Sequence, residues 1–162
     1  MNVFVTIGSQ EPFSRLHHLV DELAPEFPAL RFLAQTTGSD SFRGRHIEVL
    51  SFIPPVAFKK HLEEADLVIA HAGIGTILNV LELQKPLIVF PRLGRLHETR
   101  DDHQVATARA FEKQGYLHVA EDGPQLRAHL EAFLQGRLPP AAPIAPHASP
   151  GLLESLSEFI GK

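Results

Sequence analysis

The sequence predicts a doubly wound α/β fold built on a mostly parallel sheet of six strands. Three short, continuous apolar runs are rich in β-branched residues and suit parallel strands covered by helices on both faces; they span residues 3–7, 67–70 and 86–90. Weaker strand candidates lie at residues 30–35, 47–52 and 116–120. Strands that alternate with helices imply right-handed crossovers and a Rossmann-like sheet.

Apolar residues at helical spacing predict a helix in the intervals between these strands. The first stripe is Leu16, Leu19, Val20 and Leu23, behind a Pro12 that suits a first helical position. The remaining stripes are Phe58 and Leu62; Ile77, Val80 and Leu81; Val105, Ala108 and Phe111; and Leu126, Leu130 and Phe133.

Residues 1–137 are predicted to form one α/β domain, residues 138–150 a connector and residues 151–162 a final helix. The connector is rich in Pro and Ala, which favours an extended chain. The final helix, which includes Leu152 and Phe159, has more apolar positions than one packed face uses. We therefore expect it to pack on the domain or on a partner protein.

Composition excludes several classes of function. The net charge of −4 argues against nucleic-acid binding, which needs a basic surface to neutralise phosphates. The chain has no Cys, so disulfides and thiolate metal sites are excluded. No stretch approaches the ~20 apolar residues of a membrane span, and the first apolar run is too short for a signal peptide. We expect a cytoplasmic domain, and recruitment to a membrane protein stays compatible with the sequence.

Three loops follow strands at the carboxyl edge of the predicted sheet, where folds of this type bind ligands. The first is Gly8-Ser9-Gln10, and the second is His71-Ala72-Gly73-Ile74-Gly75-Thr76. In the second loop the glycines let the backbone approach a ligand, and Thr76 can cap the helix that follows. The free N–H groups and positive dipole of that helix start suit a diphosphate. The alternative is a tight strand-to-helix turn with no ligand.

The third loop, residues 91–104, gathers three Arg, two His and three acidic residues after a buried strand. Its length and its place at the ligand edge favour a functional role over an ordinary solvated connection. His103 and Gln104 lie where side chains can hydrogen-bond sugar hydroxyls. No spacing typical of a metal site supports ligation by His97, Asp102 and His103, so neither a metal nor a cofactor is predicted.

The glycine pattern differs from two common nucleotide motifs. A dinucleotide fingerprint places G-x-G-x-x-G after the first strand, whereas this chain has one Gly there and its Gly pair after the fourth strand. A P-loop is absent from the sequence because no Gly-Lys-Ser/Thr follows the Gly pair. Both facts count against a nucleotide-dependent reductase, the more distant alternative.

Together the loops resemble the C-terminal, donor-binding domain of glycosyltransferase family 28. The segments that carry the resemblance keep the family's order and cover most of residues 1–120; they are residues 5–10, 65–69, 71–76, 85–92 and 102–104. The resemblance implies the C-terminal half of a GT-B glycosyltransferase, with a nucleotide-sugar site in residues 1–137. A complete two-domain enzyme needs roughly twice this length, so the acceptor-binding half is expected in another protein.

Within the family the chain looks most similar to free-standing subunits that work in pairs. These are the PssE-type proteins of bacterial exopolysaccharide synthesis and the eukaryotic subunit that adds the second N-acetylglucosamine to a dolichol-linked sugar. Residues 98–104 resemble the loop of the exopolysaccharide group. The resemblance implies a heterodimer with a membrane-associated acceptor-binding subunit, which recruits this chain to the inner face of the membrane.

The resemblance also assigns roles to individual residues. Gly8, Ser9 and Gln10 are expected at the interdomain cleft near the diphosphate, and Phe52 and Ile53 beside the uracil ring. The diphosphate is expected to be held by Gly73, Ile74, Gly75 and Thr76. The transferred sugar is expected to meet Asp102, His103 and Gln104.

One position departs from the family pattern. The family commonly has Glu three residues after the loop Thr, where it grips the ribose diol, and this chain has Asn79. Asn still donates and accepts hydrogen bonds but loses the charge-assisted pair to the two hydroxyls. Asn79 therefore bears on the affinity for the donor and on its identity.

The implied reaction moves a sugar from a UDP-sugar to a lipid-linked acceptor, with inversion at the anomeric carbon. The helix start at residues 73–76 stabilises the leaving nucleotide, and Arg92, Arg95 and Arg100 are candidates for further positive charge. The general base is expected from the partner, with His71 and His103 as the candidates in this chain. The alternative function is a non-catalytic binding or regulatory module of the same fold.

Overall fold

The computed structural model describes residues 1–9 and 11–142 and contains one six-stranded parallel sheet. The strand order is β3-β2-β1-β4-β5-β6. The strands are β1 (Asn2–Thr6), β2 (Arg31–Gln35), β3 (Glu48–Leu50), β4 (Leu67–Ala70), β5 (Leu87–Val89) and β6 (His118–Val119). The predicted fold class is confirmed, and every strand candidate forms a strand.

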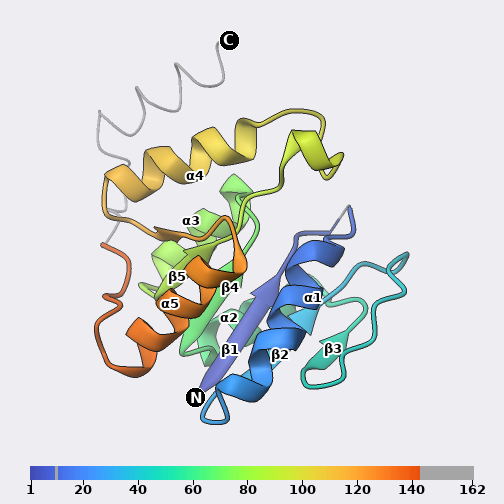
Figure 1. Ribbon diagram of the computed structural model, residues 1–162, viewed down its shortest axis with the longest axis horizontal. Coiled ribbons are helices and arrows are strands. Elements are labelled where there is room, and N and C mark those ends of the chain that lie inside the picture. The colour runs from blue at the N-terminus through green and yellow to red at the C-terminus, as the bar shows by residue number, and fades with distance from the viewer. Residues whose placement is uncertain (10, 143–162) are drawn as a thin grey trace.

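In the described residues, five α-helices cover the two faces of the sheet (Figure 1). They are α1 (Ser14–Leu23), α2 (Pro55–Glu64), α3 (Ile74–Glu82), α4 (His103–Lys113) and α5 (Gly123–Leu134), with short 3-10 turns at Ala24–Glu26 and Gly94–Leu96. The helices α1 and α5 lie in front of the strands in Figure 1. Their apolar residues join one core cluster, whereas those of α2, α3 and α4 join a second cluster on the other face.

Side chains along each central strand alternate between the two clusters. In β4, Leu67 and Ile69 belong to the cluster under α1 and α5, while Val68 and Ala70 face α2 and α3. All four are fully buried. The continuous apolar run is therefore explained by a strand that is covered on both faces.

The elements begin and end at slightly different residues from those predicted. Helix α1 begins at Ser14 rather than at Pro12, because the Phe13 carbonyl accepts the first helical bonds, from the N–H groups of Leu16 and His17. The edge strands β3 and β6 are shorter than their apolar runs, since each pairs on one side only. A single neighbour supports fewer ladder hydrogen bonds.

The chain beyond α5 returns to the domain. Leu138 packs in the cluster under α1 and α5, and Ala141 packs in the cluster on the opposite face. Most of the predicted connector and the whole predicted helix at 151–162 lie outside the described residues. Among the helices that are described, none is long and apolar enough to cross a membrane.

Candidate functional site

The strand order places two of the predicted loops side by side at the carboxyl edge. Strand β1 pairs with β2 on one side and with β4 on the other. The chain leaves β1 toward α1 on one face and leaves β4 toward α3 on the opposite face. Such a change of direction opens a crevice at the ends of the two strands, where open α/β sheets bind their ligands.

A cleft with a cavity volume of about 1050 Å³ occupies this position. It is bounded by the loops after β1, β4 and β5, and by the start of α3 and α4. The residues that line it are Ile7, Gly8, Ser9, Glu11, His71, Gly73, Gly75, Thr76, Arg92, Gly94, His97, Glu98, Thr99, Arg100 and Gln104. The volume is at the upper end of those of small-molecule sites.

The N-terminus of α3 opens on this cleft without a capping side chain. Gly73 is the N-cap residue, and the first helical hydrogen bond runs from the N–H of Ile77 to its carbonyl, 3.0 Å. Thr76 lies inside the first turn, so the expectation that its hydroxyl caps the helix is wrong. The N–H groups of the first turn, together with the helix dipole, form an anion site at the cleft wall.

His71 fills the space between the two glycine loops. A Cβ built on Gly73 would lie 2.2 Å from the His71 Nε2, and one built on Gly8 would lie 3.0 Å from the same atom. Gly8 also has a φ of +79°, in the left-handed region that glycine adopts without strain. The two glycines therefore make room for the ring as well as for a ligand.

The imidazole of His71 is held neutral at physiological pH. Its Nδ1 is buried and has no hydrogen-bond partner within the described part of the chain. Burial, and then the positive charge of Arg92, lower the pKa of His71 to about 4. The ring thus contributes shape and hydrogen-bonding atoms to the cleft rather than charge.

The loop that follows β5 is folded by its own polar side chains. The Gln104 Oε1 accepts the backbone N–H groups of Ala72 and Arg92, both at 3.2 Å, which ties the second and third loops together. The Asp102 Oδ1 accepts the Gly94 N–H at 2.9 Å. The amide oxygen of Gln104 is therefore engaged with backbone, and its NH₂ group is the part that can donate to a ligand.

The structure brings seven of the predicted site residues together around the cleft: Gly8, Ser9, His71, Gly73, Gly75, Thr76 and Gln104. Gln10 lies outside the described residues. The other predicted residues are not in the cleft lining: Phe52, Ile53, Ile74, Asn79, Asp102 and His103.

Those outside the lining differ in their surroundings. Phe52 is 75% exposed beyond β3, whereas the Ile53 side chain is buried in the core, so only its backbone is left to meet a base. Asn79 is exposed on α3. The imidazole Nε2 of His103 lies 3.3 Å from the Asp101 carboxylate, in a pair that is largely exposed.

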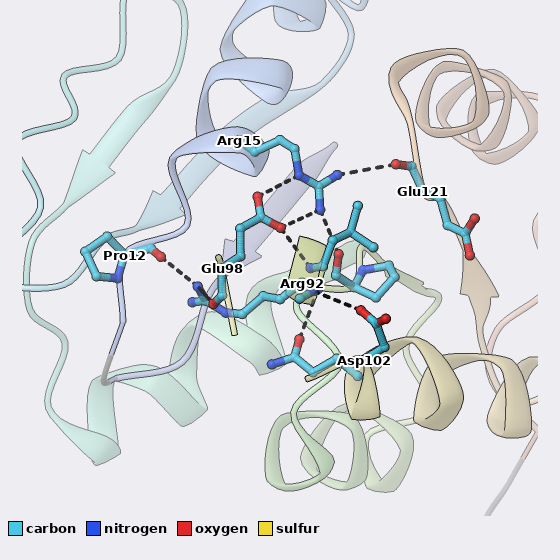
Figure 2. Close-up of polar contacts among 10 residues, drawn as sticks. Pro12, Arg15, Arg92, Glu98, Asp102 and Glu121 are labelled. Carbon is cyan, nitrogen blue, oxygen red and sulfur yellow. Dashed lines mark hydrogen bonds and ion pairs between the residues drawn. The ribbon is translucent and has the colours of Figure 1, made fainter. Parts of the chain in front are cut away.

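Sequence reasoning missed an ion pair that fixes one side of the cleft (Figure 2). The Arg15 guanidinium donates to both carboxylate oxygens of Glu98, at 2.7 and 2.9 Å. It also donates to the Pro91 carbonyl at 2.8 Å and lies 4.4 Å from the centre of the Phe90 ring. Arg15 belongs to α1, 83 residues from Glu98 in the chain, so no local pattern signals this pair.

The fold is a Rossmann-like α/β fold of the kind that GT-B glycosyltransferases contain. The chain belongs to glycosyltransferase family 28: the sequence profile described as "Glycosyltransferase family 28 C-terminal domain" matches residues 2–146. The predicted family is thereby confirmed.

Individual relatives agree with this assignment. The chain is 39% identical over 75 residues to the UDP-N-acetylglucosamine transferase subunit ALG13 of Candida albicans, which is 46% of this chain and 24% of that protein. It is 34% identical over 124 residues to the ALG13 subunit of Eremothecium gossypii, 73% of this chain and 56% of the relative. The chain thus spans about a quarter of the length of the first curated relative and about half of the length of the second.

Solved structures share the fold over nearly the whole chain. A solution structure of ALG13 superposes with a TM-score of 0.63 at 25% identity, over 96% of this chain and 94% of that one. The MurG structure from Acinetobacter baumannii gives a TM-score of 0.59 at 20% identity, over 99% of this chain and 49% of that one. The second match shows the fold alone.

Proposed function

We propose that the chain is the donor-binding subunit of a two-component, inverting glycosyltransferase that moves a sugar from a UDP-sugar to a lipid-linked acceptor. The observation that carries the proposal is the uncapped start of α3, which presents the backbone at Gly73, Gly75 and Thr76 to a cleft of nucleotide-sugar size. Two relatives bear the name of a UDP-N-acetylglucosamine transferase subunit, which supports both the donor class and the role of a subunit.

In this proposal α3 stabilises the negative charge of the departing UDP. The developing charge lies at the positive end of the helix, where preorganised N–H groups need no rearrangement during the reaction. Arg100 also lines the cleft, and the described residues offer its side chain no ion pair or hydrogen bond. It is therefore available to meet the donor's phosphates or sugar, whereas both terminal nitrogens of Arg92 donate to backbone carbonyls.

The general base is proposed to come from the partner subunit. With a pKa of about 4, His71 is a weak base at neutral pH. A general base abstracts a proton most effectively when its pKa lies near the working pH. His103 is exposed beside the cleft, and its imidazole pairs with Asp101. The exposed position of His103 is compatible with contacts to the acceptor, and the partner would then supply the general base.

We further propose that the partner is membrane-associated and that the pathway makes an exopolysaccharide, as the resemblance of residues 98–104 to PssE-type subunits suggests. The chain would then act in the cytoplasm, at the inner face of the membrane. A pull-down from membranes of the producing cell, followed by sugar transfer with the recovered pair, tests this assignment. Transfer by this chain without any partner would contradict it.

A second function, a binding module without catalysis, is favoured by one observation. Asn79 is exposed on α3 and does not line the cleft, and it replaces the acidic residue that the family uses to grip ribose. If Asn79 leaves the donor unbound, UDP affinity will be undetectable while partner association persists. Asn79→Glu would then restore UDP binding in calorimetric titrations.

Two substitutions in the first turn of α3 separate ligand binding from folding. A Cβ at Gly75 meets no protein atom within 4 Å, and the Thr76 hydroxyl caps no helix. Alanine favours helix at both positions, so Gly75→Ala and Thr76→Ala should each leave the free energy of unfolding unchanged or raise it by about 0.5–1 kcal/mol. Each should nevertheless weaken UDP binding by about tenfold, because each alters the surface that the diphosphate meets.

Calorimetric titration with UDP and UDP-sugars measures the affinities, and urea unfolding measures the stabilities. Gly38→Ala is the matched control, since a Cβ there also meets nothing within 4 Å but the residue lies away from the cleft. Equal UDP affinity in wild type and both α3 variants would remove α3 from the donor site. Repeating the titration with the partner present tests the case in which the partner completes the donor pocket.

A further inference from the structure

Arg92 is a buried cation that is surrounded by backbone carbonyl groups. The residue is 4% exposed, and its guanidinium lies 4.5 Å from the centre of the Phe13 ring. Its Nη1 donates to the carbonyl of Pro12 at 2.6 Å and to that of Glu98 at 3.4 Å. Its Nη2 donates to the carbonyl of Glu11 at 2.6 Å and to that of Ile7 at 3.2 Å.

Three of these four carbonyls belong to the loop that connects β1 to α1. Arg92 comes from the loop after β5, about 80 residues further along the chain. The bonds to Ile7, Glu11 and Pro12 therefore grip the first loop at its beginning and at its end, with Gly8 and Ser9 between them at the cleft. A loop held at both ends loses most of its conformational freedom before a ligand arrives.

The arginine itself is held in place from the other side. Its backbone N–H donates to the Gln104 Oε1 at 3.2 Å. The neighbouring Leu93 N–H donates to the Glu98 Oε2 at 2.9 Å, and the same carboxylate is gripped by Arg15 (Figure 2). The backbone from which the Arg92 side chain extends is thus fixed by contacts independent of the first loop.

These contacts leave the terminal nitrogens of Arg92 no donor capacity for a ligand. Each carries two protons, and each has two carbonyl acceptors. A residue with this geometry acts on a ligand through the loop that it holds. Lysine has three donors on one nitrogen and cannot reproduce a planar fork that spans four carbonyls.

We propose that Arg92 is a positioning residue, which holds Ile7, Glu11 and Pro12, and through them Gly8 and Ser9, in the conformation that receives the diphosphate of the donor. The inference rests on the proposed function and adds to it a residue of the cleft lining that acts on the donor through the first loop. The charge of Arg92 lies at the floor of the cleft, where it also favours an anionic ligand at longer range.

The test compares wild type with Arg92→Lys, which keeps the charge and loses the fork. Amide hydrogen exchange should rise at least tenfold at residues 8, 9 and 11 in the variant and stay unchanged in β4 and β5. The affinity for UDP should fall about tenfold. Saturating UDP should return the exchange of the loop amides to the wild-type rate, because the ligand then organises the loop that Arg92 no longer holds.

Arg127→Lys is the matched control: Arg127 is an exposed arginine of α5 whose side chain pairs with Glu26 at 2.6 Å, and it is absent from the cleft lining. Arg127→Lys should change neither the exchange of the loop amides nor the affinity for UDP. If Arg92→Lys does not fold, Phe13→Leu takes its place, since it removes the ring beneath the guanidinium; it should change loop exchange and affinity in the same direction by a smaller factor.

Unchanged loop exchange in Arg92→Lys would overturn the inference, and so would faster loop exchange with an unchanged UDP affinity. Loop exchange that stays fast in saturating UDP would show a structural role alone and would overturn it as well. Failure of the proposed function is a separate result, namely no UDP binding by the wild type with or without the partner. The exchange comparison would still decide whether Arg92 holds the loop.

Discussion

Gly73→Ala is expected to reduce the affinity for UDP by at least a hundredfold, the largest effect of any single methyl group in the cleft. The added Cβ would lie 2.2 Å from the Nε2 and 2.8 Å from the Cε1 of His71. Separations below 3.0 Å require a shift of one group. The ring has little room on the side of the first loop, where a Cβ built on Gly8 would lie only 3.0 Å from its Cε1 and Nε2.

Two relaxations are open to the variant, and both disturb the donor site. The imidazole can turn out into the cleft, where it occupies ligand volume, or Gly73 can retreat and carry the start of α3 with it. A hundredfold loss corresponds to about 2.7 kcal/mol, the usual scale of an overpacked site. The free-energy cost of the added methyl group falls on UDP binding and on the local structure of the loop, because the sheet beneath the loop keeps its own packing.

Calorimetric titration with UDP, beside urea unfolding, separates the two costs. Gly38→Ala, which adds the same atom in open space, controls for the loss of glycine itself. His71→Ala combined with Gly73→Ala removes the ring that the new Cβ meets. The double variant should therefore bind UDP better than Gly73→Ala alone, and additive losses would contradict the steric explanation.

Much of this cleft was predictable because its loops follow directly from the strand pattern. Buried strands at residues 3–7, 67–70 and 86–90 fix where three loops emerge, and the parallel sheet brings their ends to one edge. The glycines at 8, 73 and 75 were expected at the ligand for the same reason. The cleft lining contains all three.

The remaining features depend on contacts between residues far apart in the chain. Arg15 looks like a solvated helix residue in the sequence, yet it grips Glu98 across the fold. His71 was a candidate base by residue type, whereas burial and Arg92 set its pKa. The capping role expected for Thr76 failed because the helix starts three residues earlier than that role requires, with Gly73 as the N-cap. Local spacing carries no information about such distances.

His71 is expected to make the stability of the domain fall as the pH is lowered from about 6.5 to about 4. The unfolded chain has the ordinary histidine pKa of 6.5, and burial with the nearby Arg92 charge lowers the pKa in the folded protein to about 4. Between these values the unfolded state binds a proton that the folded state excludes. Stability therefore rises with pH across this window and is fully present above it.

The expected size follows from the two pKa values. A difference of about 2.5 pH units corresponds to about 3 kcal/mol of unfolding free energy lost between pH 7 and pH 4. Burial also lowers the pKa of His17 and of His118, so the protonation of these residues likewise makes the unfolding free energy fall as the pH is lowered. The contribution of His71 must therefore be taken as a difference between two proteins measured under the same conditions.

His71→Gln supplies that difference, because glutamine fills similar space and does not titrate. Urea unfolding of both proteins at pH 7, 5.5 and 4 should show the wild type losing about 3 kcal/mol more than the variant over this range. Parallel curves would mean that the folded protein protonates His71 as readily as the unfolded chain does. The ring would then carry a positive charge beside Arg92 at mildly acidic pH, and the charge balance at the floor of the cleft would change with it.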